Sequence, residues 1–174
     1  WDRKGHVHKG FKDGMDEVWS NGLRAELSRL KRENPQRPFW FTGHSLGGAL
    51  SPTLGLWLLD TQQEWDPGAR ASISVYAYAG PSPGTNDFAD YINGRLGDGL
   101  KRIFNPLDIV THAWNVSDLA EVKALYTPDI ARDVLWDKAV DFLIATTNGI
   151  HYEQIDPDAV LQEILDTTLK RATS

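Results

Sequence analysis

The sequence of 174 residues contains no cysteine. Without thiols the chain can form neither disulfides nor thiolate metal sites, which excludes a disulfide scaffold and a zinc–cysteine centre. It also lacks a run of 18 apolar residues, the length that a transmembrane helix needs, and it lacks a secretory signal pattern. The absence of cysteine fits both a cytoplasmic protein and a secreted bacterial one, so the compartment stays open.

An excess of basic charge is absent as well. The chain has 18 Lys and Arg against 24 Asp and Glu, a net charge of −6, which argues against nucleic acid as a partner. We find no repeats, low-complexity tracts or linkers, so we expect a single domain over residues 1–174. Because the first residue is Trp1 rather than methionine, we expect a processed chain or a fragment of a longer protein.

Apolar residues recur at helical spacing in some segments and form short runs in others. Segments of the two kinds alternate along the chain, which predicts an α/β fold with a mainly parallel sheet flanked by helices. The expected helices cover residues 13–33, 45–65, 86–97, 129–147 and 158–172. The expected strands cover 39–43, 71–80 and 100–110, and Pro106 breaks the last of these.

The segment from Gly43 to Gly47 matches the pattern G-x-S-x-G. This pattern marks a nucleophile only where a strand ends and a helix begins, as we expect here. The sharp turn would expose the hydroxyl of Ser45, and glycines at Gly43 and Gly47 would avoid collisions with neighbouring elements. The N–H of Leu46, at the start of the helix, would face the oxyanion of an attacked ester. A small residue in a tight turn is the alternative reading of Ser45.

A serine nucleophile needs a base and a group that orients the base, and in this fold class the chain order is Ser, then Asp or Glu, then His. His151 lies in a glycine-containing loop after Ser45, which suits an exposed base. His112 is the alternative, although it lies only four residues beyond Asp108. Asp108 follows an expected strand and is the favoured orienting group; its competitors are Asp87, Asp90 and Asp98.

The remaining histidines carry weaker signals. His44 precedes the serine, and we expect it to point away as a packed or hydrogen-bonded neighbour. His6 and His8 form H-x-H, which can bind metal, but no third ligand is near in the sequence, so we interpret them as solvated or structural. We expect no metal site.

Five segments resemble the fungal-type triacylglycerol lipases, or class 3 lipases, of the α/β-hydrolase fold. "TGHSLGGAL" at 42–50 is similar to the nucleophile elbow of that family, and "RIFNPLDIVTH" at 102–112 to its aspartate segment. "VHKGF" at 7–11 and "AGPSPGTNDFADYI" at 79–92 resemble two further family segments, and "HYEQ" at 151–154 fits the histidine position.

The resemblance implies a triad of Ser45, Asp108 and His151 and hydrolysis of carboxylic esters through an acyl-enzyme, without a cofactor. Triacylglycerol or another ester would be the substrate, with transient contact to a lipid interface. It also implies an upstream strand ending in Arg-Gly, which supplies a second oxyanion donor, and a lid helix. Both would precede Val7, so we expect the N-terminal strands and the lid to be missing from this sequence.

Two other functions stay open at this stage. One is a catalytically inert or truncated lipase-fold protein that binds a lipid or a partner. The other is a different acyl transfer, such as thioester or peptide cleavage, because a fold does not fix a substrate. The sequence leaves the oligomeric state open.

Overall fold

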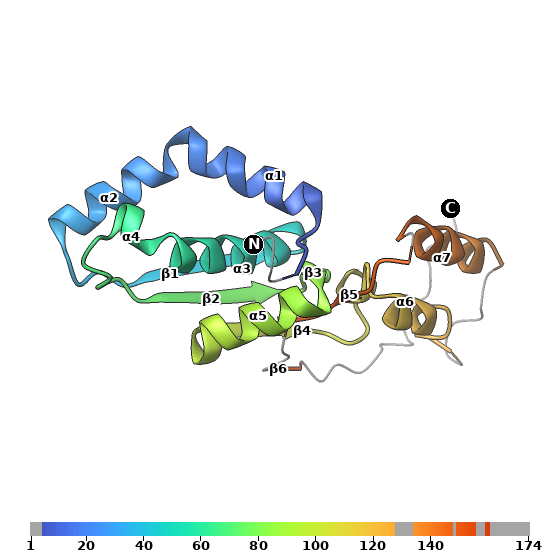
Figure 1. The fold of residues 1–174 in the computed structure, drawn as a ribbon. Helices are drawn as coiled ribbons and strands as arrows, with labels where there is room; N and C mark the ends of the chain where they lie inside the picture. The colour runs from blue at the N-terminus through green and yellow to red at the C-terminus, as the bar shows by residue number, and fades with distance from the viewer. Residues whose placement is uncertain (1–4, 128–133, 148, 156–158, 161–174) are drawn as a thin grey trace, which may run out of the picture.

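A four-stranded parallel sheet forms the centre of the protein (Figure 1). The structure is a computed structural model that describes residues 5–127, 134–147, 149–155 and 159–160. The strand order is β1-β2-β4-β6, and every pairing is parallel. The strands are β1 (Phe39–His44), β2 (Ile73–Tyr78), β4 (Leu100–Phe104) and β6 (Ala159–Val160).

Helices connect the first three strands of the sheet, as an alternating sequence predicts. The chain passes from β1 through α3 (Leu46–Asp60) and the short α4 (Gln62–Trp65) to β2. It continues through α5 (Asn86–Leu96) and a 3-10 turn to β4. All three carboxyl ends therefore lie at one edge, because parallel neighbours point the same way.

The two faces of the sheet differ in burial. The register aligns Phe41, Val75 and Leu100 on one face, where Val75 and Leu100 are fully covered. Helix α3 packs closely here, because a Cβ added to Gly55 would lie 2.5 Å from Val75 Cγ2. On the opposite face Trp40 is 75% exposed. The described helices therefore make the core with one face of the sheet.

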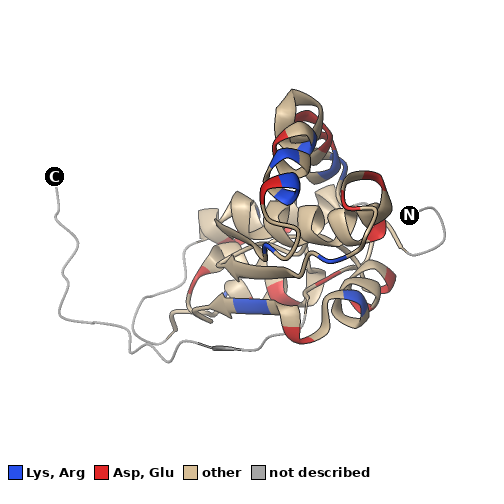
Figure 2. Ribbon diagram, turned by 90° about the vertical axis from the view of Figure 1, so that its left-hand side faces the viewer, with Lys and Arg blue, Asp and Glu red and all other residues tan. Residues whose placement is uncertain are grey.

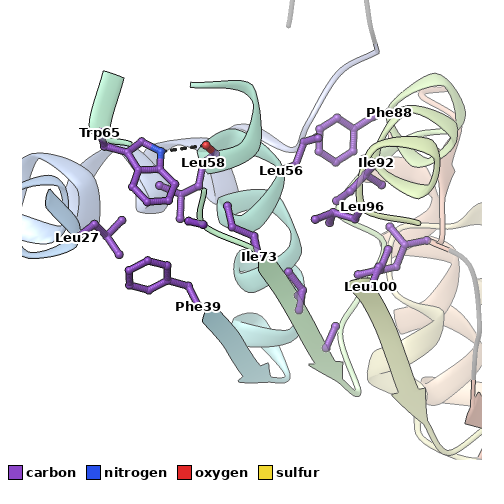
Figure 3. Close-up of a cluster of buried hydrophobic side chains, with 14 residues drawn as sticks. Leu27, Phe39, Leu56, Leu58, Trp65, Ile73, Phe88, Ile92, Leu96 and Leu100 are labelled. Carbon is purple, nitrogen blue, oxygen red and sulfur yellow. Dashed lines mark hydrogen bonds between the residues drawn. The ribbon is translucent and has the colours of Figure 1, made fainter. Parts of the chain in front are cut away.

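The core combines aliphatic side chains from the helices and strands with a few aromatic ones (Figure 3). Trp65 shows how a polar group is accommodated there, since its Nε1 donates a hydrogen bond of 3.0 Å to the carbonyl of Leu58. Each fully buried aliphatic or aromatic side chain contributes about 1.5–3 kcal/mol to stability. The labelled core residues are Leu27, Phe39, Leu56, Leu58, Trp65, Ile73, Phe88, Ile92, Leu96 and Leu100.

The predicted helix over 13–33 is wrong as a single element. It begins earlier, as α1 (Lys9–Val18), and a distorted turn (Trp19–Leu23) separates it from α2 (Arg24–Glu33). Gly22 has φ 118°, a conformation that an α-helix cannot contain. The kink lets the two helices follow the curvature of the core instead of running straight past it (Figure 1).

Charged side chains on α1 and α2 form pairs along each helix. Lys9 pairs with Asp13, Lys12 pairs with Asp16, and Arg29 bridges two glutamates. In Figure 2 blue and red segments alternate along these helices. Exposed pairs of this kind contribute only about 0.3–0.5 kcal/mol each, so they support solubility more than stability.

The predicted strand over 100–110 ends at Phe104. Asn105 and Pro106 turn the chain, and a 3-10 turn, η3 (Ile109–His112), follows. A proline cannot donate a hydrogen bond to a neighbouring strand, which explains the early end. The next element, α6 (Val116–Val122), was not expected from the sequence.

The C-terminal part confirms one predicted helix and contradicts the start of another. Helix α7 (Val134–Thr146) falls within the predicted 129–147 and packs on α6. Residues 159–160 form β6 beside β4, where we expected a helix from 158; residues 161–172 of that helix lie outside the described part. A small antiparallel sheet joins β3 (Gly84–Thr85) to β5 (Tyr152–Glu153). Among the described residues, no helix is long and apolar enough to span a bilayer.

Candidate active site

Ser45 occupies the turn between β1 and α3 in a conformation that is rare for a side-chain-bearing residue. Its backbone angles are φ 56° and ψ −121°. Its N–H donates a hydrogen bond of 3.0 Å to the carbonyl of Tyr78, which ties the turn to the end of β2. Strained backbone of this kind costs about 1–3 kcal/mol and persists where surrounding structure holds it. The turn has the strand–serine–helix form of a nucleophile elbow.

The glycines around Ser45 have unequal roles. A Cβ added to Gly43 would lie 2.1 Å from the carbonyl oxygen of Gly47, so a side chain there collides with the first turn of α3. A Cβ at Gly47 itself would meet no atom within 4 Å, which contradicts our expectation of a collision at both positions. The second close approach lies one residue further, where a Cβ at Gly48 would be 2.5 Å from the Tyr78 carbonyl and 2.8 Å from Gly80.

Leu46 is the first residue of α3. The N–H groups of the first turn of a helix have no carbonyl partner within the helix, so that of Leu46 is available to an external acceptor. The side chain of Leu46 is 59% exposed, and the turn is therefore open to solvent. This N–H remains our candidate oxyanion donor.

Asp108 lies at the same sheet edge as Ser45, beyond the end of β4. Its Oδ1 accepts a hydrogen bond of 2.9 Å from the N–H of Val110, which fixes the carboxylate at the start of η3. Oδ2 accepts none from a described residue and is free to receive one from a base. Since β1 and β4 are separated by one strand, their ends lie about 10 Å apart, which leaves room for an imidazole between the two residues.

His151 lies just before β5 and is exposed. Strand β5 pairs with β3, which follows the carboxyl end of β2, so the histidine enters from the side of the sheet that carries Ser45. Within the described part of the chain, its ring makes no hydrogen bond to Ser45 or Asp108. The structure therefore brings Ser45 and Asp108 to one edge, and it places His151 on the same side without a hydrogen bond to either.

The other histidines have distinct environments. His112 Nε2 lies 2.9 Å from the carbonyl of Pro106, and this contact holds its ring beside the loop. His8 caps α1 by accepting a hydrogen bond of 3.2 Å from Gly10, and its ring stacks on Trp114, which supports the structural interpretation. His44 is exposed and has no hydrogen bond to a described residue, so the expected packed or bonded neighbour was wrong.

An apolar cavity lies beside the elbow. It has a volume of about 180 Å³ and lies between α1 and α3, next to Gly47. Its walls are mainly the side chains of Met15, Val18, Phe41 and Leu50. The arrangement joins the hydroxyl of the half-buried Ser45, a backbone donor, a carboxylate and an apolar recess at one end of the sheet.

Comparison with known proteins gives consistent results. Residues 1–117 match the sequence profile of lipase (class 3). The chain is 33% identical over 91 residues to secreted mono- and diacylglycerol lipase 1 of Fusarium solani, covering 52% of this chain and 25% of that protein. Its structure superposes on the crystal structure of M37 lipase with a TM-score of 0.67 and 40% identity, covering 75% of this chain and 39% of the other.

A third relative bears on the triad. A triacylglycerol lipase whose catalytic centre is described as a serine protease triad superposes with a TM-score of 0.55 and 31% identity, over 64% of this chain and 40% of the other. The chain thus spans a quarter of the length of the Fusarium lipase and about two fifths of each of these two solved lipases. Together with the parallel sheet, these neighbours confirm the predicted α/β-hydrolase fold. The chain belongs to the class 3 lipase family.

Proposed function

We propose that the protein is a serine hydrolase that cleaves carboxylic esters, with acylglycerols as the favoured substrates. The observation that carries this proposal is the conformation of Ser45, held at φ 56° where β1 meets α3. In acyl transfer, such a strained turn presents the serine hydroxyl to the ester, next to the free N–H groups at the start of a helix. The names of the related lipases support the choice of ester substrate.

The proposed reaction begins when His151 takes the proton from Ser45 Oγ as that oxygen attacks the ester carbonyl. The N–H of Leu46 donates to the oxyanion that forms. Collapse of this intermediate breaks the ester bond, and the departing alcohol takes the proton from His151. Water then releases the acid from Ser45 by the reverse sequence. Asp108 holds the imidazole in the correct tautomer and stabilises its charged form throughout.

The apolar cavity beside Gly47 supports an acyl chain as the group transferred. Burial of each methylene group there would contribute about 0.8 kcal/mol to binding. The cavity of about 180 Å³ lies at the elbow itself, so a chain that enters it would place its carbonyl near Ser45.

The test is labelling of the protein with a fluorophosphonate, followed by peptide mapping. We expect modification of Ser45 alone, because only an activated serine displaces fluoride from such a probe. Folded protein that remains unlabelled would refute the proposal. The second candidate, an inert lipid-binding or partner-binding protein, would then be favoured, and the missing hydrogen bond between His151 and Asp108 already gives it some support.

We also propose that α7 contacts the surface of lipid aggregates. The described part of α7 exposes apolar side chains on the side away from α6, among them Leu135 at 74% and Phe142 at 69%. Figure 1 places α6 and α7 beyond the carboxyl ends of β2 and β4, near the edge that carries Ser45. A partly apolar helix at this position can bring the site to an interface.

Replacing Leu135 and Phe142 together with serine is expected to lower the rate on emulsified triacylglycerol by about tenfold or more, since each side chain contributes about 1.5–3 kcal/mol on burial. The rate on a water-soluble short-chain ester should be unchanged, because the catalytic groups are untouched. Trp40→Ser provides a matched control, since Trp40 is 75% exposed on β1. Equal losses on both substrates would contradict the proposed interface.

A further inference from the structure

A second cavity lies away from the elbow, on the α5 side of β4. Its volume is about 380 Å³, and side chains from α5, β4, η3, α6 and the β5 segment line it. The triad candidates Ser45, Asp108 and His151 do not line it. The proposed hydrolysis therefore leaves this cavity without a role.

Arg102 forms the inner wall of this cavity and is 5% exposed. Its guanidinium stacks on Phe104, with Cζ 3.8 Å from the ring centroid. Within the described residues it has no hydrogen bond or ion pair, and its Nε is buried without an acceptor. Burial lowers the pKa of Arg102 to about 10, so the group stays charged at neutral pH. Asp118 attracts this charge but forms no ion pair with it, and a buried charge without a close partner is costly, so this position favours an anion.

His112 adds a second unsatisfied group to the wall. Because the carbonyl of Pro106 can only accept, the hydrogen of the neutral ring lies on Nε2, 2.9 Å from that oxygen. Nδ1 is then an acceptor, and it is buried without a partner. A ligand in this cavity therefore meets an unpaired donor at Arg102 and an unpaired acceptor at His112.

The outer part of the cavity carries the opposite charge. Asp90 and Glu153 line it and are exposed, and Asp118 of α6 lines it and is half-buried. Burial raises the pKa of Asp118. A simple anion would be repelled by these carboxylates, and a simple cation by Arg102. A molecule that carries one negative and one positive group complements both Arg102 and the outer carboxylates.

We propose that this cavity binds a small zwitterion, whose phosphate or carboxylate pairs with Arg102 and whose ammonium group lies against Asp90 and Glu153. The donor geometry of a guanidinium suits both anions. Free amino acids and phosphocholine-type groups, including those at the surface of a phospholipid, share this chemistry. The inference does not depend on hydrolysis at Ser45.

Titration calorimetry on the full chain tests the proposal, with phosphocholine, glycine, inorganic phosphate and choline as separate probes. We expect phosphocholine or glycine to bind more tightly than phosphate or choline. Arg102→Met should weaken that binding by at least about tenfold, since it removes one partner of a buried charge pair. Glu153→Gln should weaken zwitterion binding and strengthen the binding of phosphate, because it removes a carboxylate that repels a simple anion. Arg32→Met, on α2, is the matched control and should leave binding unchanged.

Vesicles of phosphatidylcholine distinguish a lipid head group from a free zwitterion. Binding to vesicles that Arg102→Met abolishes would assign the head group, whereas binding to the soluble probes alone would assign a free ligand. If Arg102→Met does not fold, Arg102→Lys replaces it, because lysine keeps the charge and loses the planar pair of donors. The proposal is overturned if no probe binds the wild-type chain, or if binding survives in both Arg102 variants. Fluorophosphonate labelling of Ser45 is unaffected by either result.

Discussion

Ser45→Ala is expected to lower the turnover of a soluble p-nitrophenyl ester by at least about 10⁴-fold and to abolish fluorophosphonate labelling, because it removes the atom that forms the acyl-enzyme. The substitution deletes one oxygen at a half-buried position, so the free energy of unfolding should change little. Initial rates and intact-mass spectra after labelling measure both effects.

Ser51→Ala supplies the matched control for this experiment. Ser51 lies in α3, the helix that follows Ser45, is 7% exposed and has an Oγ without a partner among the described groups. Ser51 lines the apolar cavity rather than the elbow, so labelling of Ser45 should persist, and the rate on a short-chain ester should be close to that of the wild type. If Ser45→Ala retained activity that Ser51→Ala lost, the elbow would not be the catalytic centre.

The same assay tests the other two members of the triad. Asp108→Asn and His151→Ala should each reduce turnover by roughly 10⁴-fold, and the triple variant should be little worse than Ser45→Ala, because triad residues act as a unit. His112→Ala is the decisive comparison, since His112 is the alternative base. If His112→Ala greatly reduced turnover while His151→Ala had a normal rate, His112 would be the base instead of His151.

The elements that position the elbow were predictable because their signals are local. The apolar run of β1, the G-x-S-x-G segment and the helix formers after it lie next to one another in the sequence. The parallel order of the strands also follows from their alternation with helices. Asp108 was predictable for a related reason, since it follows the turn signal that comes directly after β4, at Asn105 and Pro106.

The elements that were not predicted from the sequence depend on contacts between distant segments or on a weak local sequence signal. The break at Gly22 is preceded by Asn21, a pair typical of turns that the surrounding helix formers concealed. Helix α6 begins at a capping residue, Asn115, whose Oδ1 accepts from Ser117 and Asp118. Strand β6 exists because it pairs with β4, and no local pattern encodes that partner.

The burial of Arg102 was equally invisible in the sequence. In the run "LKRIF", the alternation along β4 places Arg102 on the same face as Leu100, toward the helices. Nothing in the neighbouring residues distinguishes it from Lys101, which lies on the opposite face. Pairing between strands decided which of the two cations was buried, and this explains why the second cavity was not expected.

Gly43→Ala is expected to destabilise the protein by about 3 kcal/mol or more and to remove Ser45 labelling. The added methyl group would lie 2.1 Å from the Gly47 carbonyl oxygen, and both partners belong to backbone that cannot rotate away. Forcing atoms into a packed site costs about 1–3 kcal/mol even where side chains can adjust, and here β1 and α3 would have to separate. Because this separation moves the serine, activity and stability should fall together. Thermal and urea unfolding measure the loss.

Gly47→Ala is the matched control, because it makes the same chemical change four residues away, where an added Cβ meets no atom within 4 Å. An alanine in a helix is favoured over glycine by about 0.5–1 kcal/mol, so this variant should be as stable as the wild type or slightly more stable. Gly48→Ala, with a Cβ 2.5 Å from the Tyr78 carbonyl, should behave like Gly43→Ala instead. Gly43→Ala and Gly48→Ala are therefore expected to destabilise the protein, whereas Gly47→Ala is not. If Gly43→Ala and Gly47→Ala unfolded at the same urea concentration, the close approach of β1 to α3 would not exist in solution. The strain at Ser45 would then need another source.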